Sequence, residues 1–201
     1  MPTYRNEKTT HCVDLIQLFS KTGGRNRRNF RLNDRKSHLR TSANEHDWLG
    51  GGIYFWEDDP VRAFSFSKER MKWKGIAGKK PAVIGAVIDL GLCLNFFDQP
   101  ALMELGEGHA ELKADFEAMA IDLPTNGDKG RLWARDLDCA VVEAVHDLRE
   151  KAGLPSYDTV RSAFQEGKAV YPGTLFREQH HIQIAVRNAT CIKGYFLPRS
   201  S

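Results

Sequence analysis

Stretches rich in β-branched and aromatic residues mark the strands that the sequence predicts. In residues 182–186, isoleucine and valine occupy every second position, the period of a strand with one buried face. Residues 53–56 and 192–197 also combine isoleucine with aromatic residues over the length of a strand. Residues 82–90 form a continuous apolar run, which is typical of an interior strand. The pattern therefore predicts strands in the middle and at the C-terminal end of the chain.

Other segments repeat their apolar residues at helical spacing. Helices are predicted over residues 10–19, after the Asp58-Asp59-Pro60 turn, from Asp98 to about Ala120, and around residues 137–148. Aspartate before proline is a typical helix start, because aspartate caps free N–H groups and proline fits the first turn. Strands and helices in this order predict an α+β fold for a single domain over residues 1–201.

Composition places the chain among ordinary globular proteins. Its 201 residues are 41% hydrophobic and 27% charged, and no apolar run reaches membrane-spanning length. The N-terminus lacks the pattern of a signal peptide, so we expect a cytoplasmic protein with no membrane partner. The four cysteines include no Cys-x-x-Cys pair, and His180 and His181 are neighbours that point to opposite faces of a strand. We therefore expect no metal site.

Positive charge is concentrated in one segment. Residues 21–40 hold eight lysines and arginines against one aspartate, so they carry about +7 and the rest of the chain about −4. Interleaved asparagines and Phe30 add hydrogen-bonding and stacking groups, a mixture that suits single-stranded nucleic acid. The predicted nucleic-acid contacts in this basic loop, at about residues 21–41, are Arg25, Arg27, Arg28, Arg31 and Arg35. The alternatives are a solvated loop or an arm that docks on an acidic protein, such as an antitoxin.

A triple-glycine turn precedes the most informative strand. After Gly50-Gly51-Gly52, the alternation of a strand sends Ile53 and Phe55 to one face, and Tyr54 and Trp56 to the other. The first pair can enter a core, while the second pair can offer flat rings to a ligand. A strand tyrosine beside a simple tight turn is the alternative interpretation.

This strand, with the acidic turn and helix that follow, resembles the central element of the ADP-ribosyltransferase fold in its poly-ADP-ribose-polymerase and diphtheria-toxin branch. The resemblance implies a split mixed β-sheet with flanking helices, and NAD as co-substrate. It implies that Tyr54 stacks on the nicotinamide, that Phe64 closes the other side, and that Arg5, on a short first strand, contacts the ribose or phosphate. Asp47 and Gly52 would lie at the edge of this cleft.

The C-terminal strand of the family carries a catalytic glutamate, and the matching position here is Gln183. A carboxylate stabilises the oxocarbenium-like state formed when the nicotinamide–ribose bond breaks, whereas glutamine can only orient the ribose hydroxyl. The charge is therefore expected from Glu178, at the start of the same strand. Glu166 is the alternative, in a predicted loop over residues 164–167 that would lie over the acceptor.

Together these features predict an NAD-dependent mono-ADP-ribosyltransferase, a bacterial toxin of the toxin–antitoxin or anti-phage kind. Its predicted acceptor is a nucleic acid, with RNA preferred over duplex DNA. ADP-ribosylation of a protein is one alternative and hydrolysis of free NAD is another. A non-catalytic module that binds NAD, ADP-ribose or a protein in a degenerate cleft is the competing class, and the uncharged Gln183 favours it.

Overall fold

The computed structural model describes residues 10–16, 39–76, 80–127 and 133–198, with backbone alone for residues 10–16. In this part of the chain, seven strands form one mixed sheet: β1 (Thr10–Ile16), β2 (Ile53–Glu57), β3 (Val83–Asp89), β4 (Cys93–Asn95), β5 (Thr159–Ala169), β6 (Arg177–Val186) and β7 (Ile192–Phe196). The α-helices are α1 (Pro60–Trp73), α2 (Gln99–Ala118) and α3 (Asp136–Lys151), and a short 3₁₀ helix spans Ala189–Cys191.

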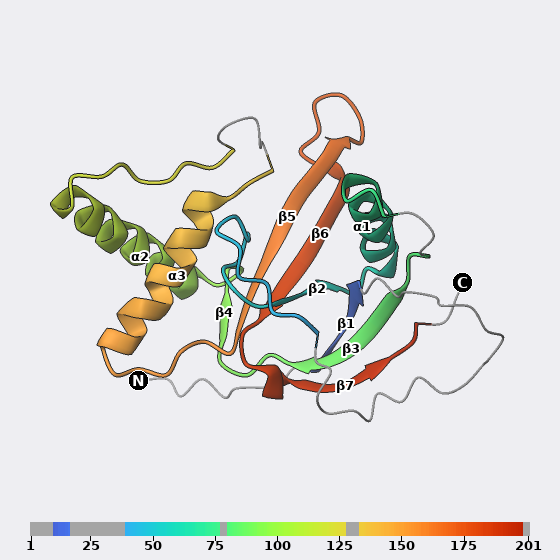
Figure 1. The fold of residues 1–201 in the computed structure, drawn as a ribbon, viewed down its shortest axis with the longest axis horizontal. Helices are drawn as coiled ribbons and strands as arrows, with labels where there is room; N and C mark the ends of the chain where they lie inside the picture. The colour runs from blue at the N-terminus through green and yellow to red at the C-terminus, as the bar shows by residue number, and fades with distance from the viewer. Residues whose placement is uncertain (1–9, 17–38, 77–79, 128–132, 199–201) are drawn as a thin grey trace.

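The strands follow the order β4-β5-β6-β2-β1-β3-β7. Only β4 and β5 run parallel, and every other neighbouring pair is antiparallel. Figure 1 shows α2 and α3 packed together at the β4 side of the sheet and α1 at the other side. The α+β class is confirmed. The expected split of the sheet is wrong for the described strands, which form one continuous ladder.

The segment predicted as the first helix is a strand. Residues 10–16 pair with β3 along their whole length, and Val13 and Asp14 in their middle also pair with the last two residues of β2. An apolar stripe this short fits either period, and Thr10 and Val13 are β-branched residues that favour a strand. Backbone hydrogen bonds to strands on both sides therefore override the helical spacing.

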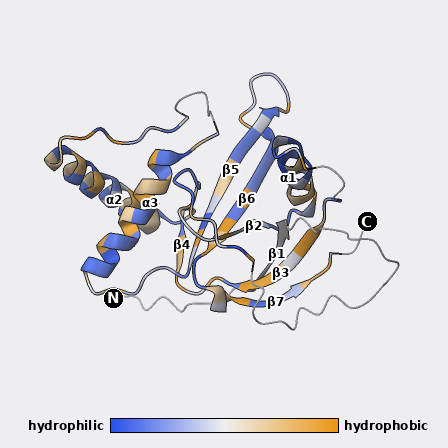
Figure 2. Ribbon diagram, viewed as in Figure 1, coloured by the Kyte–Doolittle hydropathy of each residue, from blue (hydrophilic) through white to orange (hydrophobic). Residues whose placement is uncertain are grey.

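The predicted loop over residues 164–167 is part of strand β5. Residues Thr159–Glu166 pair continuously with β6, and the ladder shifts register between Glu166 and Ala169, beside Gly167 at φ +80°. Polar residues in the outer half of β5 obscure the alternation of apolar and polar residues that would have predicted a strand. Figure 2 shows the matching change along β6, which is hydrophilic in its outer half and hydrophobic near β2. Strand β4 was also not predicted.

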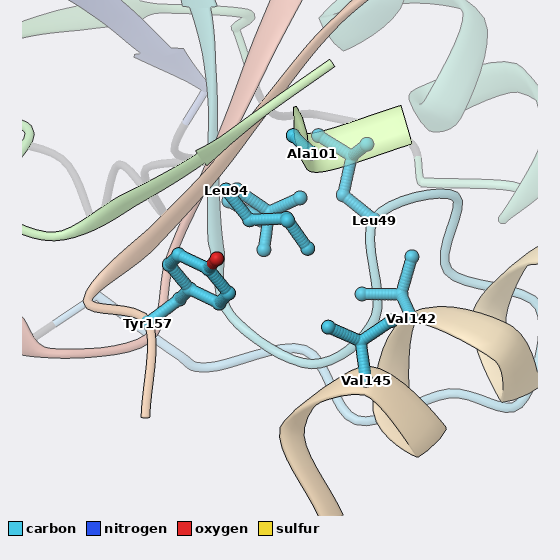
Figure 3. Packing of buried hydrophobic residues seen from close by; sticks show 8 residues of the cluster. Leu49, Leu94, Ala101, Val142, Val145 and Tyr157 are labelled. Atoms are coloured by element: carbon cyan, nitrogen blue, oxygen red, sulfur yellow. The ribbon is translucent and has the colours of Figure 1, made fainter. Parts of the chain in front are cut away.

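Both faces of the central strand β2 are buried. Ile53 and Phe55 pack on one face against β3, β6 and Cys191. On the other face, Tyr54 contacts a cluster beneath α2 and α3, and Trp56 packs against α1. Figure 3 shows Val142 and Val145 of α3 pointing toward Leu49 and Leu94 in the first of these clusters. The predicted alternation of β2 is confirmed, but the expectation that Trp56 offers its ring to a ligand is wrong, because Trp56 is 5% exposed and belongs to a core of its own.

Truncation of Phe55 tests this placement. Phe55 is 0% exposed, so Phe55→Ala should lower the free energy of unfolding by about 3–5 kcal/mol through lost burial and a cavity. The matched control is Phe64→Ala on α1, where the side chain is 37% exposed and the expected loss is about 1 kcal/mol or less. Urea unfolding of both variants measures the difference. Equal losses would contradict the burial of β2.

Candidate functional site

The pairing of β2 with β6 brings two distant sequence segments together. Trp56 lies opposite Gln183, and Tyr54 lies opposite Ala185. On the other side of β6, Gln183 lies opposite Ser162, and β5 thereby adds its residues to the same face. Paired residues of antiparallel strands share a face of the sheet. The triple-glycine strand and the strand of Gln183 are therefore hydrogen-bonded neighbours in the middle of the sheet.

A buried arginine on α1 joins this face to β5. Asp59 caps the helix by accepting a hydrogen bond from the Arg62 backbone N–H at 2.8 Å, which fixes Arg62 in the first turn. The Arg62 guanidinium donates to Glu166 Oε2 at 2.7 Å and lies 6.0 Å from the centre of the Trp56 ring. Arg62 is 7% exposed, so the Glu166 carboxylate compensates a charge that water barely reaches.

His181 and Gln183 complete what we call the polar cluster, which consists of Arg62, Glu166, His181 and Gln183. Nδ1 of His181 lies 2.7 Å from the carbonyl oxygen of Gln179, and Nε2 lies 3.0 Å from the side-chain nitrogen of Gln183. Burial lowers the pKa of His181, although the nearby carboxylate of Glu166, 3.7 Å from Nδ1, acts in the opposite direction. The ring is therefore neutral at pH 7.

Tyr54 closes the glycine turn with its hydroxyl group. The hydroxyl donates to the Gly50 carbonyl at 2.7 Å and accepts from the Leu49 N–H at 2.8 Å. Burial raises the pKa of Tyr54 well above its ordinary value, against the effect of the hydrogen bond from Leu49. Gly52 pairs with Ser42 through two backbone hydrogen bonds, of 2.8 and 2.9 Å, which close the whole loop over residues 42–52.

An ion pair holds the glycine turn against α3. The carboxylate of Glu143 accepts from the Gly51 N–H at 2.7 Å and from both terminal nitrogens of Arg187 at 2.7 and 3.0 Å. Burial opposes ionisation of Glu143, but these hydrogen bonds and the Arg187 charge outweigh it and hold its pKa below the ordinary value. Gly50 has φ +72°, and a Cβ there would lie 2.4 Å from Glu143 Oε1. No other residue fits this position without strain.

A cavity of about 680 Å³ opens beside this turn. Residues 41–45, Gly51, Cys139 and Ala140 of α3, and the Glu143–Arg187 pair contribute to its wall. Its volume lies in the range of small-molecule sites, roughly 300–1,000 Å³. Burial raises the pKa of the Cys139 thiol to about 11, so this cysteine is not a thiolate at neutral pH. Its size and the polar groups of its wall make this cavity a candidate binding site.

Several predicted residues lie away from the polar cluster. Phe64 is exposed, and Lys68 Nζ lies 4.3 Å from its ring centre, whereas Phe66 is an aromatic residue of α1 that packs against Trp56. Asp47 accepts hydrogen bonds from the backbone and side chain of Asn44 and so serves the loop. Glu178 is exposed.

Strand geometry separates Glu178 from Gln183. Gln179 pairs with Glu166 on the face of the polar cluster, so its neighbour Glu178 points to the other face. The face of the sheet, and not the distance along the strand, separates the two carboxylates, because Glu166 lies opposite Gln179, which is itself four residues or about 13 Å from Gln183. The carboxylate of Glu166 lies 3.7 Å from Nδ1 of His181, whereas Glu178 is on the opposite face of the sheet from this ring.

Other predicted residues fall outside the described part of the chain, and their roles remain predictions. These residues are Arg5, Arg25, Arg27, Arg28, Arg31 and Arg35.

Sequence reasoning missed Arg62, His181 and the Glu143–Arg187 pair. His181 had a detectable signal, because it lies two residues before Gln183 and a strand sends both to one face. The indication for Arg62 was weaker, because this residue could be placed in the first turn of the helix capped by Asp59 but not matched with a partner. The meeting of Glu143 with Arg187 depends on how α3 docks, which no local pattern specifies.

Comparison of the chain with models of protein families, with curated proteins and with solved structures gives no match. In the described residues, no helix combines the length and the apolar character needed to cross a membrane. Within the same residues, no three histidine, cysteine, aspartate or glutamate side chains gather closely enough to hold a metal ion.

The contact between Gly50 and Glu143 gives a direct test of the turn. Gly50→Ala should lower the free energy of unfolding by about 2–4 kcal/mol, since it adds a clash to the cost of a positive φ. Gly75→Ala is the matched control, because Gly75 has φ +59° but no atom within 4 Å of a Cβ, and should cost about 1–2 kcal/mol. Thermal and urea unfolding measure both. If Gly50→Ala lowers the free energy of unfolding by no more than Gly75→Ala does, Glu143 does not lie close enough to Gly50 to exclude a side chain.

Proposed function

We propose that this chain is an NAD-dependent mono-ADP-ribosyltransferase. The observation that carries the proposal is the pairing of Trp56 with Gln183, since it joins the two segments that resemble the nicotinamide-binding and catalytic strands of these enzymes. The polar cluster then lies on the same face and adds a carboxylate, an arginine and a neutral histidine. Cleavage of the nicotinamide–ribose bond requires a carboxylate near the developing cation and a group that holds the ribose hydroxyl.

In the proposed reaction, Gln183 holds the ribose and Glu166 supplies the negative charge. The bond from ribose C1′ to the nicotinamide nitrogen breaks, and its electron pair leaves with neutral nicotinamide. The Gln183 carbonyl oxygen would accept a hydrogen bond from the ribose 2′-hydroxyl and hold the sugar in place. An acceptor oxygen or nitrogen then bonds to C1′ and gives up a proton.

Glu166 is our choice for the charged group, in place of Glu178. Its carboxylate lies 3.7 Å from His181, and it is 26% exposed, so it can face both the cluster and a ligand. A negative charge at this place would stabilise the oxocarbenium-like state and could take the acceptor's proton. The ion pair with Arg62 fixes its position.

The rest of NAD would extend toward the cavity beside the glycine turn. Arg187 on that cavity's wall lies four residues after Gln183, about 13 Å along the strand direction. An extended dinucleotide can reach over this distance. Polar groups of residues 41–45 and the Glu143–Arg187 pair would then meet its ribose and phosphate groups.

We propose a nucleic acid as acceptor, RNA in particular, with residues 21–40 as its docking arm and with bacterial toxin–antitoxin or anti-phage defence as the setting. The charge of that arm supports this choice, since the remainder of the chain is mildly acidic. The second candidate function is a non-catalytic module that binds NAD or ADP-ribose. The neutral amide of Gln183 and the engagement of the Tyr54 hydroxyl within its own turn favour it.

Labelled NAD separates these functions. Incubation with cell extract should transfer label from the ADP-ribose part to RNA, and Glu166→Gln should lower this transfer by about a hundredfold while NAD binding stays nearly unchanged. Glu178→Gln is the matched control on the same hairpin and should retain most activity. Label in protein would identify a protein acceptor, and free ADP-ribose would identify hydrolysis. Binding without any cleavage would establish the non-catalytic module, and the reverse ranking of the variants would move the charge to Glu178.

A further inference from the structure

We propose that His181 is a positioning residue that fixes the orientation of the Gln183 amide, so that the carbonyl oxygen Oε1 faces the substrate. The inference deepens the proposed function and rests on it. It explains how an uncharged side chain can hold a ribose hydroxyl at the position where the family has a glutamate.

The orientation follows from the hydrogen bonds of one ring. The carbonyl oxygen of Gln179 can only accept, so Nδ1 of His181 must carry the proton at 2.7 Å. A neutral imidazole then has a lone pair on Nε2, which must accept. Its partner at 3.0 Å is the side-chain nitrogen of Gln183, which donates. The oxygen of that amide therefore points away from His181.

The surroundings of His181 favour this single tautomer. Its side chain is 0% exposed, and its ring lies 6.2 Å from the Trp56 ring and 5.8 Å from the Phe164 ring. The charged groups that face it are Glu166, Arg62 and the more distant Asp59. Glu166 is paired with Arg62 through a hydrogen bond of 2.7 Å, and burial lowers the pKa of the ring. An imidazolium is therefore disfavoured at neutral pH.

The constraint matters because a glutamine amide can turn over with almost no change of shape. Its NH₂ group would then face the substrate, and a donor cannot accept the hydrogen of a ribose hydroxyl. With His181 in place, the turned amide would set Oε1 against the Nε2 lone pair and lose a hydrogen bond. Protonation of His181 removes this preference, because Nε2–H would attract Oε1. Activity should therefore fall as the pH is lowered through the pKa of His181.

A tautomer measurement tests the orientation without any substrate. Two-dimensional NMR of ¹⁵N-labelled protein at pH 7 should show His181 neutral with the proton on Nδ1. His181→Phe should shift the side-chain amide resonances of Gln183, and His180→Phe should leave them in place. His180 is the matched control because it lies next in the same strand, on the other face, against Phe176. A proton on Nε2, or an imidazolium, would overturn the proposal.

Kinetics then tests the consequence for NAD cleavage. His181→Phe should lower kcat roughly tenfold with KM for NAD little changed, because a pre-oriented acceptor is lost. His181→Gln should recover most of the rate, since its side-chain carbonyl can accept from Gln183, and should lose the acidic limb of the pH profile. An unchanged kcat and pH profile in His181→Phe would refute the positioning role.

The two failures can be told apart. A wild-type protein that neither binds nor cleaves NAD refutes the proposed function and, with it, the catalytic consequence for His181. Activity in wild type together with the wrong tautomer refutes the positioning role alone.

Discussion

The antiparallel ladder between β2 and β6 is the contact on which the rest of the molecule depends. It runs from Ile53 opposite Val186 to Trp56 opposite Gln183. A slip of one residue would turn every side chain of β2 to the wrong face, so the register is fixed by two separate cores. Phe55 belongs to one core and Tyr54 to the other. The same register that buries these rings sets the partners of Gln183.

Loop 42–52 depends on that ladder and on α3. Its ends are joined by the backbone pair of Ser42 with Gly52, and the carboxylate of Glu143 holds the adjacent N–H of Gly51. Glu143 and Arg187 are partly exposed, so their ion pair contributes modest free energy. Its main effect is geometric, because a bidentate pair fixes the wall of the cavity and the glycine backbone together. A small-residue turn is what allows this close approach.

Much of the fold could be predicted from the sequence because several elements are locally determined. The cap at Asp59, the apolar run of β3 and the alternation near Ile184 each specify their own structure. Strand β1 was missed because its apolar residues fit a helical spacing as well as an alternating one. Strand β5 was missed because polar residues in its outer half obscure the alternation. In both strands, pairing with distant strands decided the outcome.

The site was predictable only in part. Gln183 and Tyr54 were predicted as site residues from short motifs, and Glu166 entered as an alternative. Its contact with Arg62 and His181 arises from three elements meeting in space, which no spacing along the chain encodes. The preference for Glu178 in the sequence reasoning came from its nearness along the chain, and the alternation of a strand separates it from Gln183.

The central claim is that the β2–β6 pairing forms a site for NAD. The most direct measurement is an NMR titration of the ¹⁵N-labelled protein with NAD, read at the Trp56 indole, the Gln183 side-chain amide and the backbone of residues 41–45 and 51. The account predicts saturable shifts at all of these groups, because one extended ligand would touch the polar cluster and the cavity together. Shifts confined to other surfaces, or no shifts at millimolar NAD, would contradict it.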